Sequence, residues 1–402
     1  MPHEDRFALE EIFGRPAVGP LAGVVVADLS RVLAGPYCTM LLADLGALVI
    51  KVEGPGGDDT RRWAPPRRGE DSTYYLSVNR NKYSIALDFK DRDDLAVVRQ
   101  IVDRADVVIQ NFKPGGLGKF GLDAESLRKE RPELVYASIS GFGTDGGANL
   151  PGYDLLVQAL SGMMDLTGSA DGEPMRSGVA VFDVITGLHA ALGILAALRV
   201  RDETGRGDHV EVNLMSSALS GLVNQTAAYV AGGVVPTRMG NEHPSLYPYE
   251  PFSTADKEIV IAVGNDTQFA ALCRCLDLPA LPADPRFATN EARNANRAQL
   301  RVVLTERLQT RPAADWFELL QGANVPAAPI LSVAEGTRFA QQLGLAPVVE
   351  TGTDQRRIPA IRNPIQFTES QLDYSKAAPT LDGDHDQVAR WLAATVSKHE
   401  AP

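Results

Sequence analysis

The chain has 402 residues, of which 44% are apolar and 22% charged, and its formal net charge is −12. This length allows two or three domains and is enough to bury a large core. The acidic balance argues against a general nucleic-acid binder and against a partner of anionic membranes. The cysteines, Cys38, Cys273 and Cys275, form no Cys-x-x-Cys pair, which argues against a disulfide framework and a structural zinc site.

The chain shows no sign of export or of membrane insertion. The N-terminus lacks a basic region followed by a long apolar run, and the longest apolar stretch, 184–200, contains Thr186, His189 and glycines. Such a stretch is too short and too polar for a membrane span. We therefore expect a cytoplasmic protein that binds no membrane.

Strand and helix patterns alternate in the first part of the chain. The strands are expected at 24–30, 47–53, 106–112 and 134–143, and the helices at 34–46, 95–105 and 124–130. Strand–helix–strand units of this length predict a doubly wound α/β fold with a parallel sheet. Such folds bind ligands at the carboxyl ends of the strands.

The later chain predicts a second domain. Helical patterns at 152–164 and 183–205 flank a polar, Gly-rich loop, and the texture changes near 225 to Gly, Pro and aromatic residues. A strand at 257–264 and several helices follow. We expect three segments: the first part of a large domain at 1–224, a smaller α+β domain at 225–325, and a return segment at 326–402 that completes the large domain.

Signatures of metal or dinucleotide binding are missing from the sequence. The six histidines show no His-x-x-x-His spacing, and the first strand-to-helix turn, LSRVLAGP, lacks Gly-x-Gly-x-x-Gly. A nucleotide-dependent oxidoreductase is therefore disfavoured. Basic residues instead follow several strand ends: Arg61, Arg62, Arg80, Lys82, Lys90, Lys113 and Lys119. Each alone is typical of a solvated loop, but together they predict an edge of the sheet suited to phosphates.

Asp183 is the most notable carboxylate. It follows the Gly-rich loop and begins the most apolar helix pattern in the chain. Its simplest role is that of a helix N-cap. A carboxylate at a helix N-terminus is also held anionic by the helix dipole and amide donors, and it can attack a thioester. Asp154 and Asp165 compete for this role, although both positions are typical of helix surfaces.

Taken together, the sequence resembles the family III CoA-transferases, a group that includes formyl-CoA:oxalate and carnitine CoA-transferases and the α-methylacyl-CoA racemases. The similarity runs in order from about Leu21 to about Phe367, through PLAGVVVADLSRVLAGPYCTMLLADLGALVIKVE, RNKYSIALDFK, ADVVIQNFKPG, GYDLLVQALSG and DVITGLHAALGILAALRVRDETGRGDHVEVNLM. It implies a Rossmann-like large domain built from both chain ends, a small domain, and a homodimer of interlocked chains.

The resemblance also implies the site. The family's nucleophilic aspartate falls on Asp183, and its CoA-contacting positions fall on Val32, Leu33, Leu87, Lys90, Asn111, Phe112 and Lys119, with Tyr153 and Asp154 near the acyl group. Neither a metal nor a permanently bound cofactor is implied, since the CoA thioester is a substrate. Glu53-Gly54 stands where some transferases carry an arginine for the CoA phosphates, so Arg61 or Arg62 is the expected replacement.

The resulting prediction is an acyl-CoA:carboxylate CoA-transferase, with succinyl-CoA as one candidate donor and a small carboxylic acid as acceptor. Leu33 replaces the glutamine of oxalate-specific relatives, and Arg31 is expected either to receive a second carboxylate or to be structural. Backbone amides near Asp183 and in the Gly-rich loop before it are expected to stabilise oxyanions. A racemase is a weaker interpretation, because the histidine that racemases use as a base falls on Tyr153. A tyrosine, whose ordinary pKa is near 10, is a poor replacement for that base. A non-catalytic CoA-binding partner subunit stays open.

Overall fold

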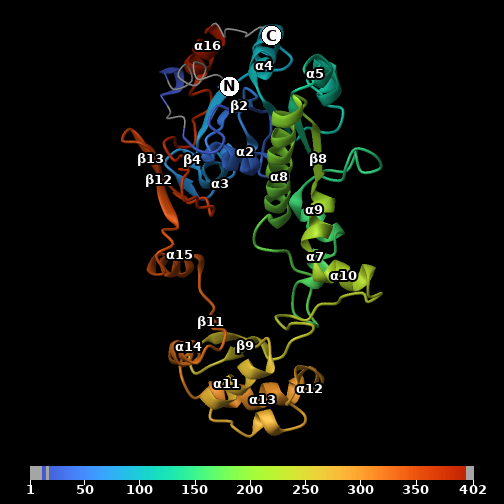
Figure 1. Cartoon of the computed structure of the whole chain (residues 1–402), viewed down its shortest axis with the longest axis vertical. Coiled ribbons are helices and arrows are strands. Elements are labelled where there is room, and N and C mark those ends of the chain that lie inside the picture. Colours follow the sequence, from blue (N-terminus) through green and yellow to red (C-terminus); the bar gives the residue numbers. More distant parts are fainter. Residues whose placement is uncertain (1–10, 15–17, 395–402) are drawn as a thin grey trace. The chain divides into compact units, whose positions relative to one another are not determined.

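The computed structural model describes residues 11–14 and 18–394, which form two compact units (Figure 1). Unit 2 consists of Met164–Met175 and Val235–Leu345, and unit 1 contains the other described residues. The main segment of the smaller unit therefore begins and ends later than the expected range of 225–325, and the unit also includes a segment of the Gly-rich loop that no change in sequence texture marks. Residues 1–10 and 15–17 of the expected first segment and 395–402 of the return segment lie outside the described residues.

A six-stranded parallel sheet forms the centre of unit 1. Its strands are β1 (Val25–Asp28), β2 (Leu48–Glu53), β5 (Lys82–Ala86), β6 (Val107–Gln110), β7 (Val135–Ser140) and β8 (His209–Asn213). They lie in the order β5-β2-β1-β6-β7-β8, which is the 3-2-1-4-5-6 order of doubly wound sheets. The predicted parallel α/β sheet is confirmed, and the order reverses direction between β1 and β6.

Helices cover both faces of this sheet, because alternate strand residues point to opposite sides. On one face, α2 (Ala34–Asp44), α8 (Val181–Thr204) and α9 (Leu214–Gly221) pack on Val26, Val49, Val107 and Val135. On the other, α4 (Arg92–Arg104), α5 (Ala124–Glu130) and α16 (His385–Ala393) pack on Val25, Ile50, Val108 and Tyr136. The result is a three-layer unit with a separate core on each side of the sheet.

The longest helix, α8, meets the length and composition of a membrane span, with 44% of its most apolar window buried inside the protein. Its side chains Ala190, Ile194 and Leu198 lie in the core against the sheet. A core helix of a globular unit can have the same length and composition as a membrane span. The helix ends at Gly205, whose φ of 71° lies in the left-handed region that favours glycine.

Shorter elements complete unit 1. They are β3 (Arg67–Arg68), β4 (Asp71–Ser72), α3 (Thr73–Val78), α6 (Asp154–Leu160), α10 (Asn224–Val230) and the hairpin β12 (Val348–Thr353) with β13 (Arg356–Ile361). The helix expected at 152–164 is instead α6 followed by α7 (Met163–Leu166), since Gly162 between them has a φ of 90°. The strand β5, inside NRNKYSIALDFK, was not expected.

Unit 2 has its own core around Phe252, Leu272, Leu304 and Trp316. Its antiparallel sheet has the order β11-β10-β9. The elements are β9 (Tyr249–Ser253), β10 (Glu258–Ala262), α11 (Asp266–Cys275), α12 (Asn290–Ala295), α13 (Arg297–Leu308), α14 (Ala313–Gly322), β11 (Ala327–Pro329) and α15 (Val333–Gln342).

Candidate active site

A pocket of about 410 Å³ opens in unit 1 at the carboxyl ends of β1 and β6. This is the point where the strand order reverses, and doubly wound sheets bind their ligands there. Its lining brings together six of the sequence-predicted positions: Val32, Leu33, Asn111, Phe112, Tyr153 and Asp183. Arg31, Trp63 and the segment 148–152 also line it.

The side chain of Asn111 joins the two loops that meet at this pocket. Its Oδ1 accepts the backbone N–H of Arg31 at 3.0 Å, and its Nδ2 donates to the Arg31 carbonyl at 2.7 Å. An amide has a donor and an acceptor side by side, so one side chain satisfies both backbone groups. Asn111 therefore fixes the loop after β1 against the loop after β6.

Val32 has a left-handed backbone, with a φ of 71°, which is costly for a β-branched residue. Its N–H donates to the buried carboxylate of Asp58, 3.2 Å away. The Asp58 carboxylate in turn binds the ammonium of Lys51 at 3.0 Å, and that ammonium also donates to the Ser30 carbonyl at 2.9 Å. These contacts hold the strained loop after β1 in place.

The loop rests on a network of buried charges. Lys82 Nζ lies 3.2 Å from the carboxylate of Asp28 and also donates to the Pro36 carbonyl at 2.9 Å. Burial opposes ionisation of Asp28, but the Lys82 and Lys51 ammonium groups outweigh it and lower the pKa of this carboxyl. Buried charges are tolerated only when they are paired and hydrogen-bonded, so this network fixes where the loop can sit.

Asp183 is not the N-cap of α8, which corrects the simplest sequence-based interpretation. The carboxylate of Asp154 takes that role from a distant part of the chain, since its Oδ1 accepts the N–H groups of Phe182 at 2.8 Å and Asp183 at 3.2 Å. Its Oδ2 accepts a hydrogen bond from Gln158 Nε2 at 2.5 Å. Asp154 is buried and does not line the pocket, so it acts on Asp183 from behind.

The carboxylate of Asp183 has no hydrogen-bond or ion-pair partner in the described part of the chain. Burial, and next the negative charge of Asp154, raise its pKa from 3.8 to about 7. Both effects disfavour the charged form. A desolvated, unpaired carboxylate is more basic than an ordinary one, and strongly shifted groups in clefts are typical of functional sites.

The first turn of α8 has no free amide to offer a ligand. Phe182 and Asp183 donate to Asp154, while the N–H groups of Val181 and Val184 donate to the Val179 and Ala180 carbonyls. The expectation that amides next to Asp183 stabilise an oxyanion is therefore wrong for this turn. The Gly-rich loop lies partly in unit 2.

The N-terminus of α2 is the alternative source of amides. Leu33 and Ala34 line the pocket, and their N–H groups have no acceptor among residues 11–14 and 18–394. Gly187 of α8 packs on this end of α2, since a Cβ at Gly187 would lie 2.7 Å from the Ala34 carbonyl oxygen. Because Asp183 stands one turn before Gly187 on the same helix face, this contact brings α2's first amides and Asp183 together.

The remaining predicted CoA positions lie outside this pocket. Lys90 and Lys119 are exposed, and their loops meet beside Phe112, because the Phe89 ring stacks on Phe112 at 5.9 Å and meets the edge of Phe120 at 5.7 Å. Leu87 is buried in the core, which leaves only its backbone for a ligand.

Several basic residues that were expected at the phosphate-binding edge instead form ion pairs within the protein. Arg61 is held by Glu53, with nitrogen–oxygen distances of 2.6 and 2.8 Å. Arg80 forms a buried pair with Asp44 at 2.6 Å, and Lys82 is buried against Asp28. Arg61 is therefore unsuited to replace the phosphate-binding arginine of some transferases. The exposed Arg62, Lys90, Lys113 and Lys119 remain candidates.

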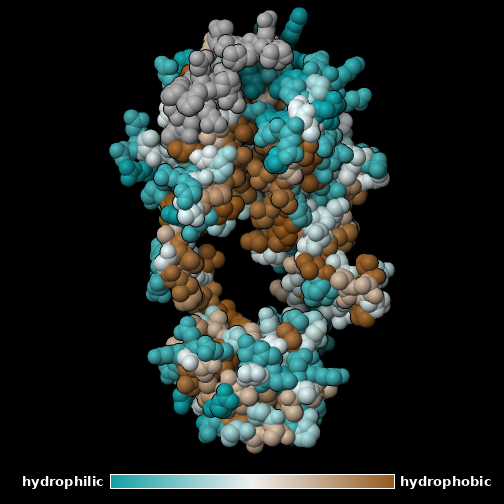
Figure 2. All heavy atoms as spheres, viewed as in Figure 1, coloured by the Kyte–Doolittle hydropathy of each residue, from teal (hydrophilic) through white to brown (hydrophobic). Residues whose placement is uncertain are grey.

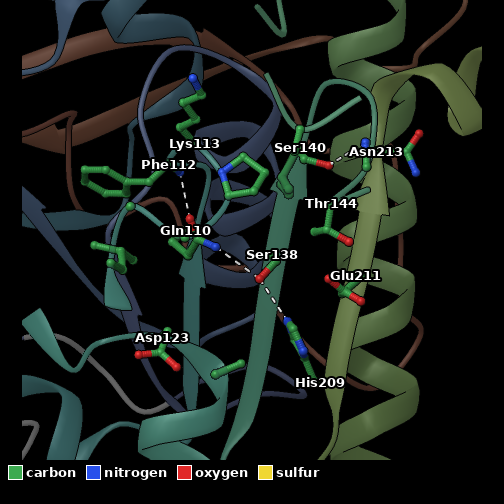
Figure 3. Close-up of a pocket in the computed structure, with 18 of the residues that line it drawn as sticks. Gln110, Phe112, Lys113, Asp123, Ser138, Ser140, Thr144, His209, Glu211 and Asn213 are labelled. Atoms are coloured by element: carbon green, nitrogen blue, oxygen red, sulfur yellow. Dashed lines mark hydrogen bonds between the residues drawn. The ribbon is translucent and has the colours of Figure 1, made fainter. Parts of the chain in front are cut away.

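A second pocket, of about 660 Å³, lies over β6, β7 and β8 and shares Phe112, Lys113 and Ser140 with the first (Figure 3). A chain of hydrogen bonds crosses it: Phe112 N–H donates to Gln110 Oε1, Gln110 Nε2 donates to Ser138 Oγ at 3.0 Å, and Ser138 Oγ lies 2.9 Å from His209 Nε2. The carboxylates of Asp123, Asp145 and Glu211 also line it. This acidic lining disfavours phosphate groups, so the first pocket fits the expected acyl-CoA better.

Sequence reasoning missed two parts of the site. Trp63 and the segment 148–151 line the pocket with Asp183, and neither carries a pattern that marks a function. The lysine inside the apolar strand ALVIKVE was an available signal for the buried charges, because Lys51 is fully buried there. Within the described ranges, no group of three His, Cys, Asp or Glu side chains is placed to hold a metal ion.

A desolvated carboxylate in a pocket at the switch point of a doubly wound sheet is typical of a functional site. The model of CoA-transferase family III matches residues 21–385, and the chain belongs to that family. It is a family III acyl-CoA:carboxylate CoA-transferase.

The chain also matches individual relatives over almost their whole length. The chain is 42% identical to the succinate–glutarate CoA-transferase of Agrobacterium fabrum, over 95% of this chain and 98% of that protein. It is 39% identical to the acetyl-CoA:oxalate CoA-transferase of Acetobacter aceti, over 94% and 97%. The crystal structure of a CaiB/BaiF family protein from Brucella suis covers 93% of this chain and 100% of its own, with 43% identity and a TM-score of 0.84.

Proposed function

We propose that the enzyme moves CoA from succinyl-CoA to a dicarboxylic acid through covalent intermediates on Asp183. The observation that carries this proposal is the unpaired, desolvated carboxylate of Asp183, with its pKa raised to about 7, in the pocket at the switch point. The names of the relatives support succinyl-CoA as donor and a small acid as acceptor. The packing of α8 against the sheet supports a core helix rather than a membrane span.

The first half of the reaction transfers CoA to the enzyme. The ionised Asp183 carboxylate attacks the thioester carbonyl of the donor, the C–S bond breaks, and a mixed anhydride and CoA thiolate result. The thiolate then attacks the aspartyl carbonyl of the anhydride, which releases the donor acid as a carboxylate and leaves an aspartyl-CoA thioester. Each exchange replaces one activated carboxyl with another, which is how covalent catalysis divides a difficult step.

The second half reverses these events on the acceptor. The acceptor carboxylate attacks the aspartyl thioester, so that CoA thiolate leaves and a second anhydride forms. The thiolate attacks the acceptor's carbonyl, which gives the new acyl-CoA and restores the Asp183 carboxylate. The unpaired amides of Leu33 and Ala34 at the start of α2 are our candidates for stabilising the oxyanions.

We also propose that the chain works as an interlocked homodimer. Support comes from exposed apolar side chains on α8, where Leu188 is 46% and Leu192 66% exposed, and from the apolar atoms that gather over α8 in the space-filling view (Figure 2). Such surfaces usually mark an interface. The dimer should persist on dilution, because an interface of this kind resembles a domain core. A monomer at nanomolar concentration in mass photometry would contradict it.

The function is tested by a screen of carboxylic acids against succinyl-CoA and acetyl-CoA, with mass detection of the new acyl-CoA. We expect stoichiometric exchange with the wild-type enzyme and none with Asp183→Asn. Hydrolysis of the donor without acyl exchange, or epimerisation of an α-methylacyl-CoA, would contradict the proposal.

A further inference from the structure

Arg31 lines the same pocket as Asp183. Its backbone is held on both sides, since Asn111 binds its N–H and its carbonyl and Asp58 binds the following N–H of Val32. Its side chain, in contrast, is 59% exposed. The loop therefore fixes where the side chain begins and leaves most of the side chain exposed.

The guanidinium has spare hydrogen-bonding capacity. Its one polar partner in the described part of the chain is Asp59, at 3.5 Å from Nη1, a distance at the outer limit for a hydrogen bond. Asp59 is bound more closely by Arg62, at 2.9 Å through its other oxygen. Arginine has five N–H donors in a fixed fork that matches a carboxylate, so most of the Arg31 donors remain for a ligand.

Lys113 is the other cation of this lining. It is exposed and also borders the acidic second pocket. An ammonium on a flexible stem offers a point charge, whereas the guanidinium fork binds both oxygens of a carboxylate. Of the two cations, Arg31 is the one that can orient a carboxylate with respect to Asp183.

We infer that Arg31 is the specificity-determining residue that binds the remote carboxylate of dicarboxylic substrates, both the free acid and its CoA thioester. The inference rests on the proposed function. One carboxyl of the substrate reacts at Asp183 while the other pairs with Arg31, so the enzyme prefers a dicarboxylic acid to a monocarboxylic acid of the same chain length. Asp59 holds the guanidinium loosely until the substrate carboxylate replaces it.

The test compares glutarate with pentanoate as acceptors, because the two acids have the same number of carbons and differ in the second carboxylate. Arg31→Met should lower kcat/KM for glutarate by roughly 10- to 100-fold, as expected for a lost charge-assisted contact, and change that for pentanoate by less than about threefold. Arg31→Lys should fall between, since it keeps the charge and loses the fork. Arg357→Met is the matched control, because the Arg357 side chain is also 59% exposed and pairs with an aspartate, Asp354, but does not line the pocket.

The outcomes separate this inference from the proposed function. Equal losses with both acids in Arg31→Met would show that Arg31 acts by holding the loop, and an unchanged preference in both Arg31 variants would show that it binds no carboxylate; either result overturns the inference and leaves CoA transfer intact. If the wild-type enzyme transfers CoA to neither acid nor to any other, the proposed function fails and this inference with it. Thermal unfolding of each variant checks that it is folded.

Discussion

The backbone N–H of Asp183 donates to the carboxylate of Asp154, with 3.2 Å between nitrogen and oxygen. This contact lets Asp154 cap the helix that carries Asp183 and, at the same time, places a negative charge beside the Asp183 carboxyl. One buried residue thus positions the proposed nucleophile and raises its pKa. The effect on position and the effect on the pKa lead to different predictions.

The rate of transfer should follow the ionisation of Asp183. Since only the carboxylate attacks, kcat/KM of the wild-type enzyme should rise with pH through about 7, the raised pKa of this group. Asp154→Asn keeps an oxygen that can accept the helix amides but removes the charge, so the rise should move to lower pH. A pH profile that is the same in both proteins would show that Asp154 does not control the titration.

The same raised pKa predicts a stability effect. Between the unfolded value of 3.8 and about 7, the folded state binds the Asp183 proton more tightly than the unfolded state, so the free energy of unfolding falls as pH rises. Asp183→Asn removes this cost. It should therefore be more stable than the wild type at pH 8, by at most about 4 kcal/mol, and the difference should close toward pH 4.

Urea unfolding at both pH values measures this difference. If Asp183 were the N-cap, Asp183→Ala would instead lower the free energy of unfolding by about 1 kcal/mol. Asp183 does not cap α8, so we do not expect this loss. A variant that is equally or less stable than the wild type at pH 8 would contradict the raised pKa.

The contact between α8 and α2 can be tested through Gly187. An alanine there places its Cβ 2.7 Å from the Ala34 carbonyl oxygen, so the two helices must separate where α2 begins. We expect a loss of about 1–3 kcal/mol in stability together with a lower kcat. Gly336→Ala on α15 is the control, because no atom outside its own stretch of helix backbone lies within 4 Å of an added Cβ; it should stabilise by about 0.5–1 kcal/mol.

Lys90 and Lys119 should serve the nucleotide end of the acyl-CoA. Changing either to alanine should raise KM for acyl-CoA by the equivalent of about 1–3 kcal/mol. The effect should disappear with a pantetheine thioester, which lacks the nucleotide phosphates. Lys129→Ala, at an exposed lysine on α5, should change neither constant, and equal losses with both substrates would show that Lys90 and Lys119 are structural.

The sequence predicted the parts of this fold that depend on local patterns. Alternating strand and helix patterns gave the parallel sheet and its ligand-binding end. The strand β5 was missed because Lys82 and Ser84 occupy buried positions there, so the run lacks the apolar character of a central strand. Gly162 divides an apparently continuous helix because its φ is 90°.

Relations between distant residues could not be predicted in this way. Asp154 lies 28 residues before Phe182, whose N–H it accepts, and no local rule connects a carboxylate on one helix to the start of another. Asn111 and Arg31 are separated by 80 residues. The resemblance to a known family named Asp154 and Asn111 as CoA contacts, and the contacts of these side chains support a positioning role for both.

The central claim is that CoA transfer passes through an acyl intermediate on Asp183, and trapping that intermediate tests it most directly. The wild-type enzyme is incubated with succinyl-CoA without acceptor, treated with hydroxylamine or borohydride, digested and analysed by mass spectrometry. The account predicts a modification on the peptide containing Asp183, located at that residue, and its loss in Asp183→Asn. A label on Asp154, or substantial exchange activity in Asp183→Asn, would contradict it.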